Sequence, residues 1–214
     1  MKSKNLLFDL DGTLWDARIP VAESWTLTGR RFFGPQYQVK PEEVEKLMGL
    51  TMKEIGERLV GIFGEGVDAA SFTKASFEEE VHYLYDHPGS LFEKEEETLS
   101  SLKESGYSLY IVSNCQKGYI EAFLHALKHP EVFSGRLCFG DTKQSKDKTI
   151  RRLMGIHGLK DALYIGDTGK DEEAANKAGI GFIFASYGFG SASSPLADLP
   201  AFSLLPSLLK KLGE

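Results

Sequence analysis

Short apolar runs alternate with helical patterns in the C-terminal half of this chain, from Glu93 to Phe184. The expected strands are 107–113, 136–139, 162–165 and 181–184, and the expected helices are 93–105, 117–128, 146–157 and 170–178. A helix between successive strands lets each strand run parallel to the one before it. We therefore expect an α/β fold, a parallel sheet with helices on both faces.

Residues 16–88 interrupt this alternation, because they read almost entirely as helix. The expected helices are 21–33, a segment that begins at Pro41 and ends before Gly49, 52–63 and 69–85. No strand is expected between them. We therefore expect residues 1–15 and 89–214 to form the core, and residues 16–88 to form an inserted helical cap domain. Such a cap can close over a site at the edge of the sheet and exclude water.

The first strand of the expected sheet ends in two carboxylates. Asp9 and Asp11 directly follow an apolar run, and Gly12 permits a tight turn after them. Residues two apart in a strand share one face, so the two acids repel each other unless a cation lies between them. A divalent metal ion with oxygen ligands meets that need.

Two other interpretations of this segment remain. Asp11-Gly12 is typical of a β-hairpin turn between two apolar stretches. A calcium-binding loop needs oxygen ligands at its first, third and fifth positions and Gly at its sixth. Counting from Asp9, the sixth residue is Leu14, which disfavours a calcium loop.

Polar residues also follow the other expected strands, and the carboxyl ends of parallel strands meet at one edge of a sheet. Ser113 and Asn114 precede a helix, where they either bind phosphate or simply cap the helix. Asp141 follows the strand 136–139. Asp167 suits either a metal ligand or the N-cap of the next helix. Asp171 suits either a residue that supports the metal site or an acid in the first turn of that helix.

Three of these residue types suit phosphoryl transfer. Asp9 suits a nucleophile that forms an aspartyl-phosphate, and Asp11 suits the group that protonates the leaving oxygen and later deprotonates water. A fixed cation at Lys146 would compensate charge between the nucleophile and the phosphoryl oxygens. Lys143 and Lys148 lie close enough in the sequence to be alternatives for this role.

Together, these segments resemble the haloacid dehalogenase-like superfamily of phosphatases. Its four motifs correspond, in chain order, to Asp9-Leu-Asp-Gly-Thr, Ser113-Asn114, Lys146, and Gly166-Asp167 with Asp171. The helical insertion resembles the cap of the subgroup that includes phosphoglycolate phosphatase and β-phosphoglucomutase. One detail differs, because Asp147 follows the lysine where many members have proline.

The resemblance implies a Rossmann-like core and a Mg²⁺ cofactor. The metal site would consist of Asp9, the backbone carbonyl of Asp11, and Asp167, with Asp171 supporting it. The catalytic residues would be Asp9, Asp11 and Lys146. The residues that bind the substrate phosphate would be Thr13, Ser113 and Asn114. In the cap, Lys53 and Arg18 are candidates for contact with the rest of the substrate.

Composition narrows the class of partner. Of 214 residues, 42% are hydrophobic and 26% charged, as in soluble globular proteins. The net charge of −6 argues against non-specific binding to nucleic acid or to an anionic membrane. We find no apolar run long enough for a membrane span or a signal peptide, and we expect a cytoplasmic monomer or small homo-oligomer. Cys115 and Cys138 are expected to be reduced and unpaired.

These observations predict a Mg²⁺-dependent phosphatase that hydrolyses a small phosphomonoester through an aspartyl-phosphate, similar to phosphoglycolate phosphatase. A phosphosugar mutase is the alternative with the same chemistry, since it would transfer the phosphoryl group to a sugar. A non-catalytic binding module on the same fold is the alternative from a different class.

Overall fold

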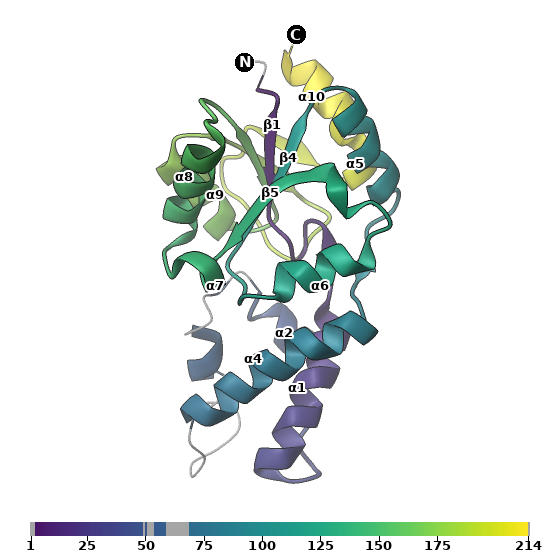
Figure 1. The fold of residues 1–214 in the computed structure, drawn as a ribbon, viewed down its shortest axis with the longest axis vertical. Helices are drawn as coiled ribbons and strands as arrows, with labels where there is room; N and C mark the ends of the chain where they lie inside the picture. The colour runs from purple at the N-terminus through teal and green to yellow at the C-terminus, as the bar shows by residue number, and fades with distance from the viewer. Residues whose placement is uncertain (1–2, 49, 51–53, 59–68, 214) are drawn as a thin grey trace.

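A six-stranded parallel sheet forms the centre of the structure, which is a computed structural model that describes residues 3–48, 50, 54–58 and 69–213 (Figure 1). Across the sheet, the strands are β5 (Phe133–Cys138), β4 (Ser108–Ser113), β1 (Asn5–Phe8), β6 (Leu163–Gly166), β7 (Gly181–Ala185) and β8 (Ala197–Leu199). Every neighbouring pair is parallel. The predicted α/β class with a Rossmann-like parallel sheet is confirmed.

Strand β1 lies inside the sheet and is apolar on both faces. Leu6 and Phe8 belong to one buried cluster, whereas Leu7 belongs to another, as the alternation of side chains along a strand requires. Leu7 pairs in register with Tyr110 of β4 and Tyr164 of β6. The sheet therefore has a hydrophobic core on each side, which is why its inner strands read as continuous apolar runs.

Helices cover both faces of the sheet. On one face, α8 (Lys146–His157) and α9 (Gly169–Ala178) pack residues such as Ile150 and Ala175 against Leu7 and Tyr164. The other face is covered by α5 (Glu95–Glu104), α6 (Tyr119–Ala126) and α10 (Leu205–Gly213). This layering places the carboxyl ends of the strands at one edge of the sheet, away from both chain termini in Figure 1.

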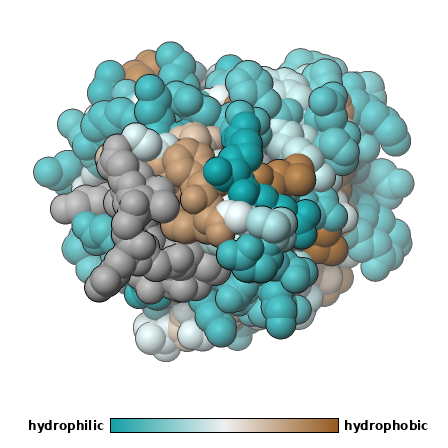
Figure 2. Space-filling view, turned by 90° about the horizontal axis from the view of Figure 1, so that it is seen from below, coloured by the Kyte–Doolittle hydropathy of each residue, from teal (hydrophilic) through white to brown (hydrophobic). Residues whose placement is uncertain are grey.

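Beyond that edge of the sheet lie helices α1 (Arg18–Phe33), α2 (Pro41–Glu45) and α4 (Ala69–Asp86). They share a core in which the Phe72 ring packs against Phe32, Phe33 and Tyr37. Seen from this end of the molecule, the surface is mostly hydrophilic, with an apolar area near its centre and smaller apolar areas toward its edges (Figure 2). The predicted helix 52–63 lies largely outside the described residues.

The chain passes between the sheet and these helices through a small two-stranded ribbon. Strand β2 (Trp15–Asp16) pairs antiparallel with β3 (Ser90–Leu91). The sequence reading had no strand at either place, because two-residue strands have no detectable periodicity. That residues 16–88 form a separate cap domain stays a prediction.

Some other elements differ from the sequence-based expectation. Strand β8 and the short helix α7 (Phe139–Thr142) were not expected, and neither were the 3-10 turns η1 (Pro130–Val132) and η2 (Phe202–Leu204) or helix α10. Helix α6 is shorter than the expected 117–128, because Gly118 is left-handed at φ +94° and Leu127 is extended. None of the helices in the described ranges combines the length and hydropathy that a membrane span requires.

Candidate active site

The carboxyl ends of the three inner strands bring together residues from distant parts of the chain. Asp9 follows β1, Ser113 ends β4, and Asp167 follows β6, and all three are almost fully buried. The Asp9 N–H donates to the Ile165 carbonyl at 2.8 Å, so the chain keeps the register of the sheet up to the first acid. The predicted convergence of these strand ends is what the structure shows.

A tight turn follows Asp9. The Leu10 carbonyl accepts hydrogen bonds from the N–H groups of Thr13, Leu14 and Trp15, at 2.8 to 3.2 Å. Gly12 has φ +76°, and a Cβ there would lie 2.2 Å from Asp167 Oδ2. A side chain at position 12 would therefore occupy the space of the Asp167 carboxylate, so glycine is required for both its backbone angle and its size.

Lys146 lies between two of the acids. Its Nζ is 2.9 Å from Asp9 Oδ1 and 2.5 Å from Asp171 Oδ1. Burial lowers the pKa of this lysine, but the charges of Asp171 and Asp9 outweigh that effect and raise its pKa well above the usual range. The other Asp171 oxygen accepts from the Thr168 N–H at 3.0 Å and the Thr168 hydroxyl at 2.6 Å. Asp171 therefore fixes the lysine, and the lysine fixes Asp9.

Lys143 and Lys148, the alternatives to Lys146, are both exposed. The Lys143 ammonium lies over the Phe139 ring, 5.5 Å from its centroid. Asp141 is also exposed and accepts from the Cys138 N–H at 3.1 Å. Asp141 therefore does not join the cluster. Its position after a strand of the sheet had suggested that it would.

Asp9, Asp167 and Asp171 form a group that suits a metal ion. Each offers a carboxylate oxygen within 4.8 Å of the others. Asp167 Oδ2 accepts from the Phe189 N–H at 2.8 Å, whereas the buried Asp167 Oδ1 has no hydrogen-bond partner among the described residues. Burial and the neighbouring carboxylates raise the pKa values of Asp9 and Asp167. A divalent cation would satisfy the free oxygen and offset this repulsion, so these residues fit Mg²⁺.

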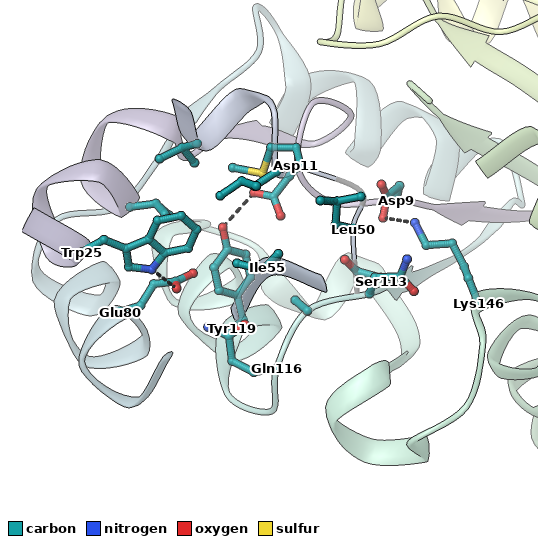
Figure 3. A pocket seen from close by; sticks show the side chains of 16 residues that line it. Asp9, Asp11, Trp25, Leu50, Ile55, Glu80, Ser113, Gln116, Tyr119 and Lys146 are labelled. Carbon is teal, nitrogen blue, oxygen red and sulfur yellow. Dashed lines mark hydrogen bonds and ion pairs between the residues drawn. The ribbon is translucent and has the colours of Figure 1, made fainter. Parts of the chain in front are cut away.

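Asp11 has a different environment from Asp9. Its Oδ1 accepts a hydrogen bond from the Tyr119 hydroxyl at 2.8 Å (Figure 3) and another from Trp15 Nε1 at 3.0 Å. Burial raises its pKa to about 7, against the opposing effect of the Tyr119 hydrogen bond. A carboxyl group with a pKa near neutrality can both give and take a proton, which suits the role expected for Asp11.

The residues expected to bind phosphate differ in position. Ser113 and Asn114 line a cavity together with Asp9, Asp11 and Lys146. Thr13 is fully buried and is not among the lining residues, and its hydroxyl has no hydrogen-bond partner in the described part of the chain. Phosphate binding by Thr13 therefore stays a prediction.

This cavity lies between the sheet edge and the helices beyond it. The space between its lining atoms is about 490 Å³, which includes open solvent at its mouth. Its apolar walls come from the helical segment and include Val21, Val44, Leu47, Leu50 and Ile55. Asp9, Asp11 and Lys146 thus line a cavity whose opposite wall is largely hydrophobic. Many sites that bind small molecules have such apolar walls.

Four polar lining residues had no signal in the sequence: Trp25, Glu80, Gln116 and Tyr119. They come from α1, α4, the segment after β4, and α6, and they meet only through the packing of these segments. Of the two cap candidates named from the sequence, Arg18 is not among the lining residues, and it pairs with Asp16 and Glu45 and stacks on Phe189. Lys53 lies outside the described residues.

Comparison with known proteins agrees with this geometry. The family described as haloacid dehalogenase-like hydrolase matches residues 6–185. A phosphoglycolate phosphatase of Aquifex aeolicus is 30% identical over 98% of this chain and 96% of its own length. A pyrophosphatase of Bacillus cereus is 26% identical over 84% of this chain and 81% of its own.

The crystal structure of a predicted phosphoglycolate phosphatase of Haemophilus somnus has a similar fold, with a TM-score of 0.84. The two sequences are 23% identical, and the match covers 97% of this chain and 98% of that one. The chain therefore belongs to the haloacid dehalogenase-like hydrolase family. The resemblance inferred from the motifs and the predicted enzyme class, a hydrolase of this family, are confirmed.

Proposed function

We propose that this protein is a Mg²⁺-dependent phosphatase that hydrolyses a small phosphomonoester through an aspartyl-phosphate. One observation carries the proposal, which is the set of groups around the buried Asp9 carboxylate. It contacts Lys146, has an oxygen within 4.8 Å of an Asp167 oxygen, and lines a cavity that Asp11 also lines. A nucleophile, a fixed cation, a place for a divalent ion and a proton carrier are the parts that this reaction requires.

Each residue has a distinct role in the proposed reaction. An Asp9 oxygen attacks phosphorus as the ester P–O bond breaks, and the Asp11 carboxyl gives its proton to the leaving oxygen. Asp11 then takes a proton from the water that attacks the aspartyl-phosphate, which releases phosphate and restores Asp9. Lys146 holds Asp9 in place, and Ser113 and Asn114 face the phosphoryl oxygens from the end of β4.

Mg²⁺ would be held by Asp9, Asp167 and the backbone carbonyl of Asp11, with Asp171 fixing the arrangement through Lys146. When bound, it would neutralise charge on the phosphoryl oxygens. The helices α1, α2 and α4 would act as a cap that shields the site from bulk water. Cys115 and Cys138 are free thiols, which suits the cytoplasm, where we place the reaction.

The decisive experiment replaces the nucleophile. Asp9→Asn should lower phosphate release from a phosphomonoester panel with Mg²⁺ by at least about a thousandfold, because an amide cannot form the aspartyl-phosphate. Circular dichroism should show a retained fold. Lys148→Met, on an exposed lysine of the same helix as Lys146, is the control and should keep wild-type activity. Turnover by Asp9→Asn would contradict the proposal.

Product analysis separates hydrolysis from transfer. Free phosphate that rises in step with substrate loss supports the phosphatase, whereas an isomeric sugar phosphate would identify a mutase. Absence of both products across the panel would favour a binding module.

A further inference from the structure

A buried carboxyl group that the proposed reaction does not use lies inside the active-site cavity. Glu80 of α4 lines the cavity and is 4% exposed. Its Oε2 accepts a hydrogen bond of 2.6 Å from Trp25 Nε1 of α1. In Figure 3, Glu80 and Trp25 lie at the opposite end of the cavity from Asp9 and Lys146, with Asp11 and Tyr119 between them.

The surroundings make this position costly for an acid without a partner. The cavity that Glu80 lines also has apolar side chains in its walls, such as Val21 and Leu47. Burial, together with a smaller effect of the charge of Asp11, raises the pKa of Glu80 to about 8, against the effect of hydrogen bonds from Trp25 and Gln116. A polar group that is buried at such a cost and faces a cavity is well placed to bind what enters that cavity.

The order of groups along the cavity fixes which part of a substrate would reach Glu80. The phosphoryl group belongs beside Asp9 and Lys146, and the oxygen that leaves belongs beside Asp11. The remainder of the alcohol then extends past Tyr119 toward Trp25 and Glu80. Glu80 therefore faces the leaving group and not the phosphate.

The charges at this end of the cavity do not suit an anionic leaving group. Of the described residues that line the cavity, Lys146 alone is cationic, and it is already bound to Asp9 and Asp171. A carboxyl group supplies no positive charge in either protonation state. A carboxylate on the leaving group would thus meet no free cation among these described residues, whereas a hydroxyl or ammonium group can donate a hydrogen bond to Glu80.

We infer that Glu80 selects phosphomonoesters whose leaving group carries no negative charge and donates a hydrogen bond to it from a hydroxyl or amino group. The inference rests on the proposed phosphatase function and specifies its substrate class. Glu80 is then a specificity-determining residue, outside the groups that act on phosphorus.

The test uses three substrates of similar size: 2-hydroxyethyl phosphate, O-phosphoethanolamine and phosphoglycolate. Their leaving groups end in a hydroxyl, an ammonium and a carboxylate. The wild-type kcat/KM for the better of the first two should exceed that for phosphoglycolate by roughly tenfold or more, the effect of one hydrogen bond to a charged group. Which of the two is faster distinguishes a neutral from a cationic natural leaving group.

Glu80→Gln tests whether Glu80 causes the selection. The amide keeps an acceptor for Trp25 but lacks the negative charge that Glu80 carries above its pKa of about 8, so in assays at pH 9 the kcat/KM ratio of O-phosphoethanolamine to phosphoglycolate should fall by roughly tenfold. Glu78→Gln is the matched control, because it makes the same substitution on the same helix at an exposed side chain, whose ion pair is with the exposed Lys74. Its ratio should equal that of the wild type.

Failure of the inference and failure of the proposed function are distinguishable. A wild-type preference for phosphoglycolate, or an unchanged ratio in a folded Glu80→Gln variant, would overturn the inference and leave the phosphatase intact. So would equal or absent turnover of all three substrates while p-nitrophenyl phosphate is hydrolysed. Absence of phosphate release from every phosphomonoester would overturn the proposed function together with the inference.

Discussion

Burial affects individual acids of this site in different ways. Asp9 and Asp171 share the ammonium of Lys146, so part of the cost of burying them is recovered as an ion pair. Glu80 has neutral donors, Trp25 and Gln116, and its pKa rises to about 8. The two kinds of environment differ in whether a buried acid has a cation as its partner or only neutral donors.

The raised pKa of Glu80 predicts a pH-dependent stability. The folded state holds this proton more tightly than the unfolded state, where the pKa is 4.5, so the stabilisation is complete at low pH and is lost as the pH rises toward 8. Glu80→Gln does not lose stability in this way, because its amide does not ionise. Its unfolding free energy relative to wild type should therefore increase between pH 5 and pH 8, by a few kcal/mol at most.

Urea unfolding at both pH values measures this change. Glu78→Gln should show no such trend, because its carboxylate is 65% exposed. An equal difference between Glu80→Gln and wild type at pH 5 and pH 8 would contradict the prediction.

The residues at strand ends could be predicted, whereas those on the helices could not. Asp9, Ser113 and Asp167 stand directly after apolar runs, so a parallel sheet brings them together whatever the details of packing. Glu80 and Tyr119 sit in ordinary amphipathic helices, and nothing in the local pattern shows that they face one cavity. Their convergence depends on how α4 and α6 pack, which local sequence does not encode.

At the scale of the element, the turn after β1 links backbone geometry to the metal site. Gly12 is left-handed and lies against the Asp167 carboxylate. The segment is short, yet it determines how closely the first and the last motif of the chain approach. Sequence reading recognised this turn because Asp and Gly have strong local preferences, whereas it missed β8, whose three residues Ala-Asp-Leu form no apolar run.

Gly12→Ala should therefore impair both folding and catalysis. The strained φ and the contact with Asp167 should lower the unfolding free energy by about 1–3 kcal/mol and reduce kcat. Gly155→Ala is the control, because Gly155 lies in α8 with open space around its Cβ position. That change should raise stability by roughly 0.5–1 kcal/mol and leave turnover unchanged. Equal effects of the two changes in urea unfolding and activity assays would refute this account.

At the scale of the whole molecule, the proposed metal site joins segments that are far apart in the sequence. Asp9 follows β1 near the N-terminus and Asp167 follows β6, so a bound ion would cross-link distant elements of the chain. A ligand that binds only the folded state raises its stability by mass action. The sequence predicted this arrangement of the sheet, but the size and lining of the cavity above it depend on tertiary packing.

Mg²⁺ should accordingly raise the melting temperature of the wild type in the absence of substrate. At a concentration 100 times the dissociation constant, the stabilisation is about 2.7 kcal/mol. Asp167→Asn should lose most of this effect, whereas Asp141→Asn, which changes an exposed acid outside the cluster, should keep it. Differential scanning fluorimetry with and without the ion measures the shift, and an identical shift in Asp167→Asn would exclude the assigned site.

The cluster of Asp9, Asp167, Asp171 and Lys146 has one consequence for the order of events in the catalytic cycle. Three carboxyl groups share one ammonium, so whenever all three are ionised the cluster carries an excess of two negative charges. A dianionic phosphate ester that approached Asp9 would then be repelled, whereas a bound dication would bring the cluster to electrical neutrality. We therefore expect the ion to bind before the ester, as a consequence of the arrangement of four side chains.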